Sequence, residues 1–145
     1  IAEIVNRKFQ ETGLGSYGVN LKTLSVKKAK EVVKVSKASA ATEFIAKKDD
    51  MIQLFIYEEV FDRLTDEVKD MLIEMALSNV SYDSEKDKLN VDTNPCNQIV
   101  SMRRKYGNAI LDNLELASML ILQVEEEEKE RKQAEREAKK AKKNN

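Results

Sequence analysis

Apolar residues at three- and four-residue spacing predict one helix near the start of the chain and another near its middle. Ile4, Val5 and Phe9 share one face of a helix over residues 2–12, which Gly13 ends. The second helix covers residues 65–79, with Thr65 as its N-cap. Its apolar face consists of Val68, Met71, Leu72, Met75 and Ala76. Both patterns are typical of helices that bury one side.

Two other segments have patterns typical of β-hairpins. The first is residues 42–57, with arms TEFIAKK and MIQLFIY joined at Asp49-Asp50. Its second arm is apolar on both faces, so we expect it to be covered on both sides. One face has Ile52, Leu54 and Ile56, and the other has Met51, Phe55 and Tyr57. The second hairpin is residues 81–92, with its tip at residues 84–87.

Two shorter segments complete the middle of the chain. Residues 58–64 (EEVFDRL) read as a short helix. Residues 23–36 are mixed, because four valines favour a strand whereas KKAKE favours a helix. We predict a helix for residues 23–36.

The C-terminal third is predicted to be helical. Asn94 as N-cap and Pro95 at the first position open a helix that stops near Tyr106-Gly107. The last helix starts near Asn108, and its apolar stripe consists of Ile110, Leu111, Leu114, Ala117, Ile121 and Val124. Apolar content ends at Glu125, and residues 125–143 are mostly strong helix formers. The pairs Glu128–Lys132, Glu127–Arg131 and Glu135–Lys139 support this helix at four-residue spacing.

These elements predict an α+β fold. Residues 1–124 form a compact domain with two β-hairpins and several helices, and residues 125–145 form a charged helical tail. Because the tail has no apolar face, we expect it to project into solvent or to lie on a partner.

Composition removes many kinds of chemistry. The chain has no histidine and one cysteine, Cys96, so it has no imidazole base and no zinc site containing histidine. Cys96 is interpreted as a small packing residue in a first helical turn. A single cysteine cannot form an internal disulfide, which favours a reducing, cytoplasmic location. No apolar run is long enough to span a bilayer, so no membrane partner is predicted.

Charge is strongly segregated although the net charge is only −1. Residues 21–48 carry eight lysines, and residues 49–92 carry thirteen acids. Such asymmetry either steers a partner or keeps the surface soluble.

The densest acidic cluster offers one enzymatic hypothesis. Paired carboxylates on facing helices hold Mg²⁺ against phosphates, as in MazG-like nucleotide pyrophosphohydrolases. The residues concerned are Glu58, Glu59, Asp62, Glu67 and Asp70. That family places its pairs on long helices far apart in sequence, whereas these lie close together, so a solvated acidic face is the favoured interpretation. GLGSYG at residues 13–18 lacks the lysine of a phosphate-binding loop.

Three short motifs suggest a family resemblance over about residues 40–110. They are Tyr82-Asp83, Glu85-Lys86-Asp87-Lys88 and Lys105-Tyr106-Gly107. With the order strand pair, helix, hairpin, helix, the chain resembles small phage-encoded metallopeptidases of the zincin type. The resemblance implies that Met75 and Asn79 occupy the two histidine positions of HExxH, and that Ala76 occupies the general-base position. None of these side chains suits zinc peptidase chemistry, so the resemblance implies inherited architecture without that activity.

Clustered cations provide a nucleic-acid hypothesis. Arg103, Arg104 and Lys105, with Tyr106 beside them, and the basic end of the tail have the composition of a phosphate-binding surface. Against this, the sequence pI is about 5.7, and Arg103 and Lys105 also suit the C-terminus of a helix.

The favoured hypothesis is a non-enzymatic interaction or assembly protein, phage-encoded if the resemblance holds, in the host cytoplasm or the virion. Its exposed charged helix docks a protein partner or self-associates, and nucleic-acid contact is the alternative. No catalytic residue, metal ligand or cofactor is assigned. The predicted partner-binding residues are Glu125, Glu126, Glu127, Glu128, Lys129, Arg131, Lys132, Arg136, Lys139 and Lys140.

Overall fold

Strand β3 (Met51–Tyr57) is the centre of a three-stranded sheet with the order β1-β3-β2. β1 (Asn20–Val26) runs parallel to it and β2 (Val33–Lys37) runs antiparallel. The computed structural model describes the backbone of residues 1–92 and 95–143 and the side chains of residues 1–92 and 99–142. The prediction that this strand is covered on both sides is confirmed for one face only. Ile52, Leu54 and Ile56 are buried, whereas on the other face Met51 and Tyr57 are buried and Phe55 is half-buried.

The prediction of a helix over residues 23–36 is wrong. Three of its four valines belong to two different strands: Val26 ends β1, whereas Val33 and Val35 lie in β2. The helix-forming KKAKE segment lies between the two strands. Val35 stands beside Leu54 of β3, so burial in the sheet outweighs the local helix preference.

The first predicted hairpin has the right second arm but the wrong partner. β3 pairs with β2, and most of the predicted first arm forms helix α2 (Ala40–Ala46). Ser39 caps this helix by accepting a hydrogen bond from the Thr42 amide at 3.2 Å, and Lys47 ends it in the left-handed conformation with φ 53°. These local signals, rather than apolar alternation, decide the structure of the segment.

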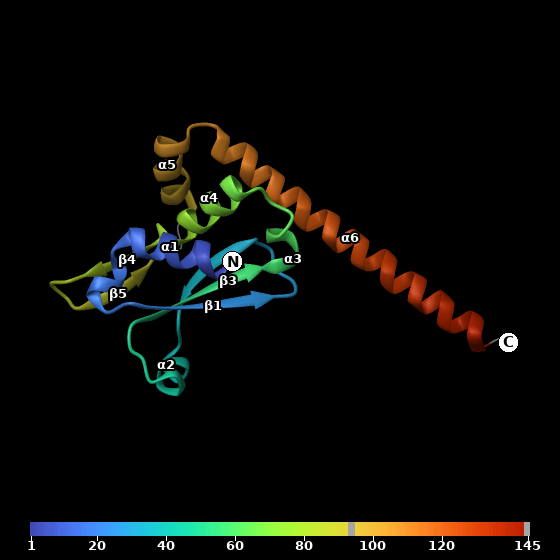
Figure 1. Cartoon of the computed structure of the whole chain (residues 1–145), viewed down its shortest axis with the longest axis horizontal. Coiled ribbons are helices and arrows are strands. Elements are labelled where there is room, and N and C mark those ends of the chain that lie inside the picture. The colour runs from blue at the N-terminus through green and yellow to red at the C-terminus, as the bar shows by residue number, and fades with distance from the viewer. Residues whose placement is uncertain (93–94, 144–145) are drawn as a thin grey trace.

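Helices α1 (Ala2–Thr12) and α4 (Asp66–Leu77) pack against each other and cover one face of the sheet (Figure 1). Both confirm predicted helices, and Gly13 ends α1 with φ 71°. The 3₁₀ helix η1 (Leu14–Tyr17) follows α1, and the short helix α3 (Glu58–Phe61) follows β3.

The hydrophobic core lies between the sheet and these helices. Its most completely buried apolar side chains come from α1, β3, α3, α4, the second hairpin and the last helix: Val5, Ile52, Leu54, Ile56, Val60, Phe61, Ile73, Leu77, Leu89 and Val124. Because segments far apart in sequence contribute to one cluster, residues 1–92 and the first half of the last helix depend on each other for burial.

The second hairpin is confirmed as β4 (Val80–Asp83) paired antiparallel with β5 (Lys88–Val91). Helix α5 (Pro95–Tyr106) follows and ends before Gly107, whose φ is 65°. The predicted N-cap Asn94 and the side chain of Cys96 lie outside the described residues.

Helix α6 (Ala109–Lys143) is the longest element, with 35 residues. At 1.5 Å per residue its length is roughly 52 Å. Its first half packs on the domain and its second half projects beyond it (Figure 1). Leu111 is a correction to the predicted buried stripe, because it is exposed. The architecture as a whole is α+β, as predicted, and no helix in the described part of the chain has the length and apolar character needed to cross a membrane.

Candidate functional site

The first half of α6 has a buried face and an unusually apolar exposed face. The buried positions are Ile110, Ala117, Ile121 and Val124, and Leu114 is half-buried. Four large apolar side chains on the same helix are instead exposed: Leu111, Leu116, Met119 and Leu122. Met119 and Leu122 are the most open of these, with 61% and 66% of their surface accessible. The exposed face therefore differs from an ordinary polar helix surface.

An ion pair fixes the start of the charged tail to the domain. Arg63, just after α3, donates from Nη1 and Nη2 to the two carboxylate oxygens of Glu127 at 3.0 and 2.7 Å. Gln123 donates to the same carboxylate at 3.1 Å, one helical turn earlier. The hydrogen bond with Arg63 lowers the pKa of Glu127, and it raises the pKa of Arg63. Such a two-point contact sets the direction of α6 as well as its position.

Two further ion pairs lie near this junction. Lys28 approaches Glu125 at 3.7 Å, and Lys132 approaches Glu128 at 2.5 Å within the helix. The hydrogen bond from Lys132 lowers the pKa of Glu128. The predicted pair Glu128–Lys132 is thus confirmed, whereas Glu127 is bound by Arg63 of the domain.

The predicted partner-binding residues therefore fall into two groups. Glu125 and Glu127 contact the domain, and Glu128 contacts Lys132. The remaining members are exposed along the projecting helix: Glu126, Lys129, Arg131, Arg136, Lys139 and Lys140. The cations of this set are therefore exposed to solvent, whereas Glu125 and Glu127 hold the start of the tail against the domain.

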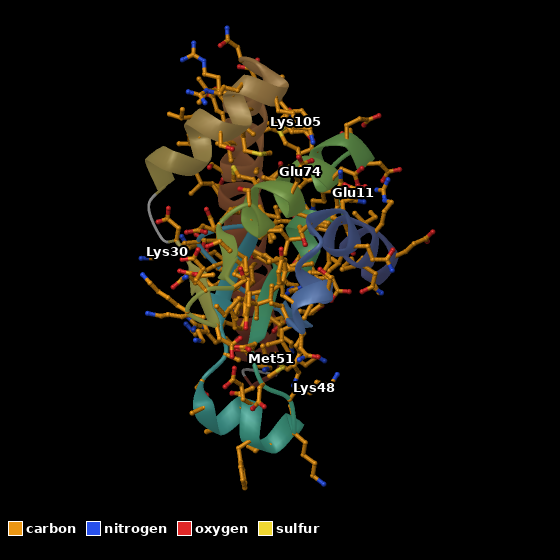
Figure 2. All side chains as sticks on the ribbon, turned by 90° about the vertical axis from the view of Figure 1, so that its left-hand side faces the viewer. Glu11, Lys30, Lys48, Met51, Glu74 and Lys105 are labelled. Carbon is orange, nitrogen blue, oxygen red and sulfur yellow. The ribbon has the colours of Figure 1, made fainter. Side chains whose placement is uncertain are left out.

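A second polar cluster centres on Glu74 of α4. Its carboxylate accepts hydrogen bonds from Lys105 and from the Tyr106 hydroxyl, and Lys8 approaches it at 3.3 Å. Lys8 also contacts Glu11 at 3.0 Å. Figure 2 shows Glu74 beside Lys105, with Glu11 on the neighbouring α1.

The electrostatics of Glu74 follow from these contacts. Burial alone would raise its pKa, but the hydrogen bonds outweigh burial, so the pKa lies below its ordinary value. The Lys105 pKa is raised, chiefly by its hydrogen bond to Glu74. The cluster ties the end of α5 to α4 and α1.

This cluster changes the interpretation of the predicted phosphate-binding residues. Lys105 and Tyr106 are bound to Glu74, so only Arg103 and Arg104 of that group are exposed without a described ion pair. Arg104 is separated from the basic tail, which begins at Lys129, by residues 109–128 of α6, roughly 30 Å of helix. The two predicted basic surfaces therefore do not form one patch.

The acidic cluster proposed for Mg²⁺ is divided in the structure. Asp70 accepts two hydrogen bonds from Arg7 at 2.6 and 2.8 Å. Glu58 and Glu59 lie elsewhere, in a cleft of about 550 Å³ lined also by Glu128. Among the described residues, no group of three acidic or cysteine side chains is placed to hold a metal ion. Helix α3 has four residues, too few to form one of the long facing helices that the Mg²⁺ hypothesis requires.

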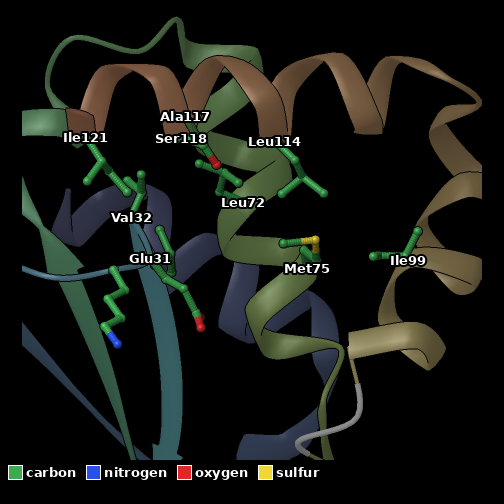
Figure 3. A pocket seen from close by; sticks show the side chains of 11 residues that line it. Glu31, Val32, Leu72, Met75, Ile99, Leu114, Ala117, Ser118 and Ile121 are labelled. Atoms are coloured by element: carbon green, nitrogen blue, oxygen red, sulfur yellow. The ribbon is translucent and has the colours of Figure 1, made fainter. Parts of the chain in front are cut away.

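The positions that the metallopeptidase resemblance singles out lie on and after α4. Met75 is half-buried and lines an apolar pocket of about 320 Å³ with Leu72, Ile99 and Leu114 (Figure 3). Ala76 is buried in the core. Asn79 follows the helix, and its carbonyl accepts a hydrogen bond from the Asp92 amide at 2.8 Å.

Sequence reasoning missed two surface features. The first is the pair of cations, Arg63 and Lys28, that bind glutamates at the start of the tail. The only signal for them in the sequence was the run of four glutamates at residues 125–128, whose negative charge favours cations from elsewhere in the chain. The second is the exposure of Phe44 and Ile45, whose accessible fractions are 85% and 80%. The segment was predicted as a strand in which these side chains pack, but it forms helix α2, which projects from the domain. The sequence signal for this helix was Ser39, a suitable N-cap residue, followed by Ala40 and Ala41.

Comparisons of the chain with protein-family models, with curated proteins and with solved structures found no match.

Proposed function

We propose that this protein is a non-enzymatic interaction or assembly protein whose domain holds out the second half of α6 as a docking helix. The observation that carries the proposal is the anchoring of the helix: Arg63 fixes Glu127, and the chain continues as one helix beyond that contact. A merely solubilising appendage has no need of a fixed direction.

The exposed residues on the projecting part support a charged partner surface. Lys129, Arg131, Arg136, Lys139 and Lys140 are open to solvent on a preformed helix. A helix that is already ordered loses less conformational entropy on binding than a disordered segment does. The proposed setting is the cytoplasm, and a phage origin is part of the proposal only through the metallopeptidase resemblance.

Deletion of residues 131–145 tests the proposal, because it removes the projecting helix and keeps the anchor. We expect an unchanged melting temperature, together with a changed mass in solution or lost partners in an affinity capture from native cells. A second variant replaces Arg136, Lys139 and Lys140 with glutamine. It keeps the helix and removes three positive charges, so it separates the effect of the charges from the effect of the helix itself. If the truncated chain retains its mass and all its partners, the docking role is wrong.

Nucleic-acid binding is the second candidate, and the exposure of Arg103 and Arg104 favours it. Phosphate contacts make affinity fall steeply with salt, so binding to single- and double-stranded DNA is to be measured at low and moderate salt. Binding that is lost with Arg103→Gln and Arg104→Gln supports this alternative. Absence of binding at low salt contradicts it.

The metallopeptidase-like ancestry remains a proposal. The order α4, β4-β5 hairpin, α5 supports it, because the resemblance expects a helix, a charged hairpin and a second helix in this sequence. The role proposed for the chain does not depend on it.

A further inference from the structure

We infer that the partner of α6 is a second copy of this chain, with the two α6 helices paired antiparallel so that the basic end of each lies on the acidic and apolar half of the other. This inference rests on the proposed function, since it names the partner of the docking helix. Two observations carry it. Large apolar side chains are exposed on the first half of α6, and the two halves of the helix carry opposite net charge.

An exposed stripe on α6 changes character along its length. Leu122 and Glu126 are one turn apart in the first half, and Arg136 and Lys140 are one turn apart in the second. All four are exposed and lie on the same side of the helix at 100° per residue. The stripe is apolar and acidic near the domain and basic toward the end of the helix.

Charge decides the direction of pairing. Residues 109–130 contain seven acids and one lysine, and residues 131–143 contain seven bases and two glutamates, so the segments carry −6 and +5. A parallel pair would place like charges together, whereas an antiparallel pair places opposite charges together. Because each α6 has both an acidic and a basic segment, a second copy of this chain supplies all the charges that the antiparallel pair needs.

The exposed apolar side chains supply the remaining contact. Met119 and Leu122 are open to water on the acidic half. The aliphatic stems of lysine and arginine from the second copy cover such side chains while their charged ends stay solvated. When residue 131 of each helix lies at the midpoint of the antiparallel pair, Leu122 of one copy lies opposite Lys140 of the other. Glu126 of one copy then lies opposite Arg136 of the other. Twofold symmetry makes each contact occur twice.

The pairing is expected to be weak and sensitive to salt, because the helices share few apolar residues and exposed ion pairs are screened. Sedimentation analysis of the full chain is therefore done at about 50 mM and about 500 mM salt. We expect a dimer at the lower salt and a monomer at the higher one. A chain that is monomeric at low salt and high protein concentration overturns the inference.

Charge exchange tests the register and direction. Glu126→Arg and Arg136→Glu are each expected to weaken the dimer about tenfold or more, because each disturbs two symmetric contacts. The double variant restores opposite charges across the pair and should recover the original affinity. Failure of the double variant to recover overturns the proposed pairing. Circular dichroism checks that each variant is folded.

Matched controls lie on the other side of the helix. Glu135→Arg and Lys142→Glu change the net charge by the same amounts at exposed positions, and we expect dimerisation to change less than about twofold. The proposed function fails separately from this inference. A monomeric chain that loses a different protein when residues 131–145 are deleted keeps the docking function and excludes self-pairing.

Discussion

Arg63 and Glu127 are 64 residues apart in the chain, and their side chains meet in a two-point ion pair where α6 leaves the domain. The arginine follows α3, and the glutamate is the third of four consecutive glutamates. Both side chains are partly exposed, so the contact contributes direction more than stability. It turns the end of a long helix into a fixed projection.

Removing Arg63 should loosen the tail without unfolding the domain. In Arg63→Gln, we expect faster amide hydrogen exchange over residues 125–131 and little change in melting temperature. The pKa of Glu127 is lowered, so its contribution is complete above the ordinary carboxyl value of 4.5 and is lost as pH falls through the lowered value. The difference between wild type and variant should therefore shrink in acid. Arg131→Gln is the matched control, and equal exchange in both variants would contradict the anchoring role.

The Glu74 cluster should contribute measurable stability. Glu74→Gln weakens charge-assisted hydrogen bonds to Lys8, Lys105 and Tyr106, and we expect a loss of about 1–3 kcal/mol in the free energy of unfolding. Because the pKa of Glu74 is lowered, the loss is largest above pH 4.5 and declines as pH falls. Chemical denaturation at several pH values measures it. Glu67→Gln on the same helix should cost no more than about 0.5 kcal/mol.

The sequence predicted those elements that local patterns specify. The helix over residues 2–12 was predicted because Gly13 marks its end, and α4 was predicted because its apolar spacing is regular. Residues 23–36 failed because they contain two strand ends and a loop, and no local window shows that β3 lies between β1 and β2. Pairing between distant strands is a property of the whole fold.

The candidate site was predicted only in part. Charge and helix propensity identified the tail, because both are local properties. The anchor was missed because Arg63 is far from Glu127 in sequence, and Lys105 was assigned to phosphate binding because Glu74 is 31 residues away. A sequence pattern indicates which side chains are charged, but the fold decides which of them are already paired.

Two phenylalanines should respond very differently to the same change. Phe61 is almost completely buried, so Phe61→Ala should cost about 3–5 kcal/mol. Phe44 is exposed on α2, so Phe44→Ala should change stability by less than about 0.5 kcal/mol. Urea denaturation of the two variants measures both values. A large loss with Phe44→Ala would mean that α2 packs on another surface.

Tyr57 should tolerate loss of its hydroxyl group. The residue is fully buried at the end of β3, and its hydroxyl has no hydrogen-bond partner among the described residues. Burying an unpaired hydroxyl costs free energy, so Tyr57→Phe should leave stability unchanged or raise it by about 1 kcal/mol. Tyr106→Phe removes the same atom but also a hydrogen bond to Glu74, and it should lower stability by about 1 kcal/mol.

Alkaline pH provides a second measurement on Tyr57. Burial raises its pKa above the ordinary value of 10.0, with a smaller contribution from Glu59. A raised pKa means that stability is complete below pH 10.0 and is lost as pH rises toward the folded-state value, because the unfolded chain ionises first. Tyr57→Phe removes this term, so its free energy of unfolding should fall less steeply above pH 10.0 than that of wild type. A clear loss of stability in Tyr57→Phe at neutral pH would instead show that the hydroxyl is hydrogen-bonded in solution.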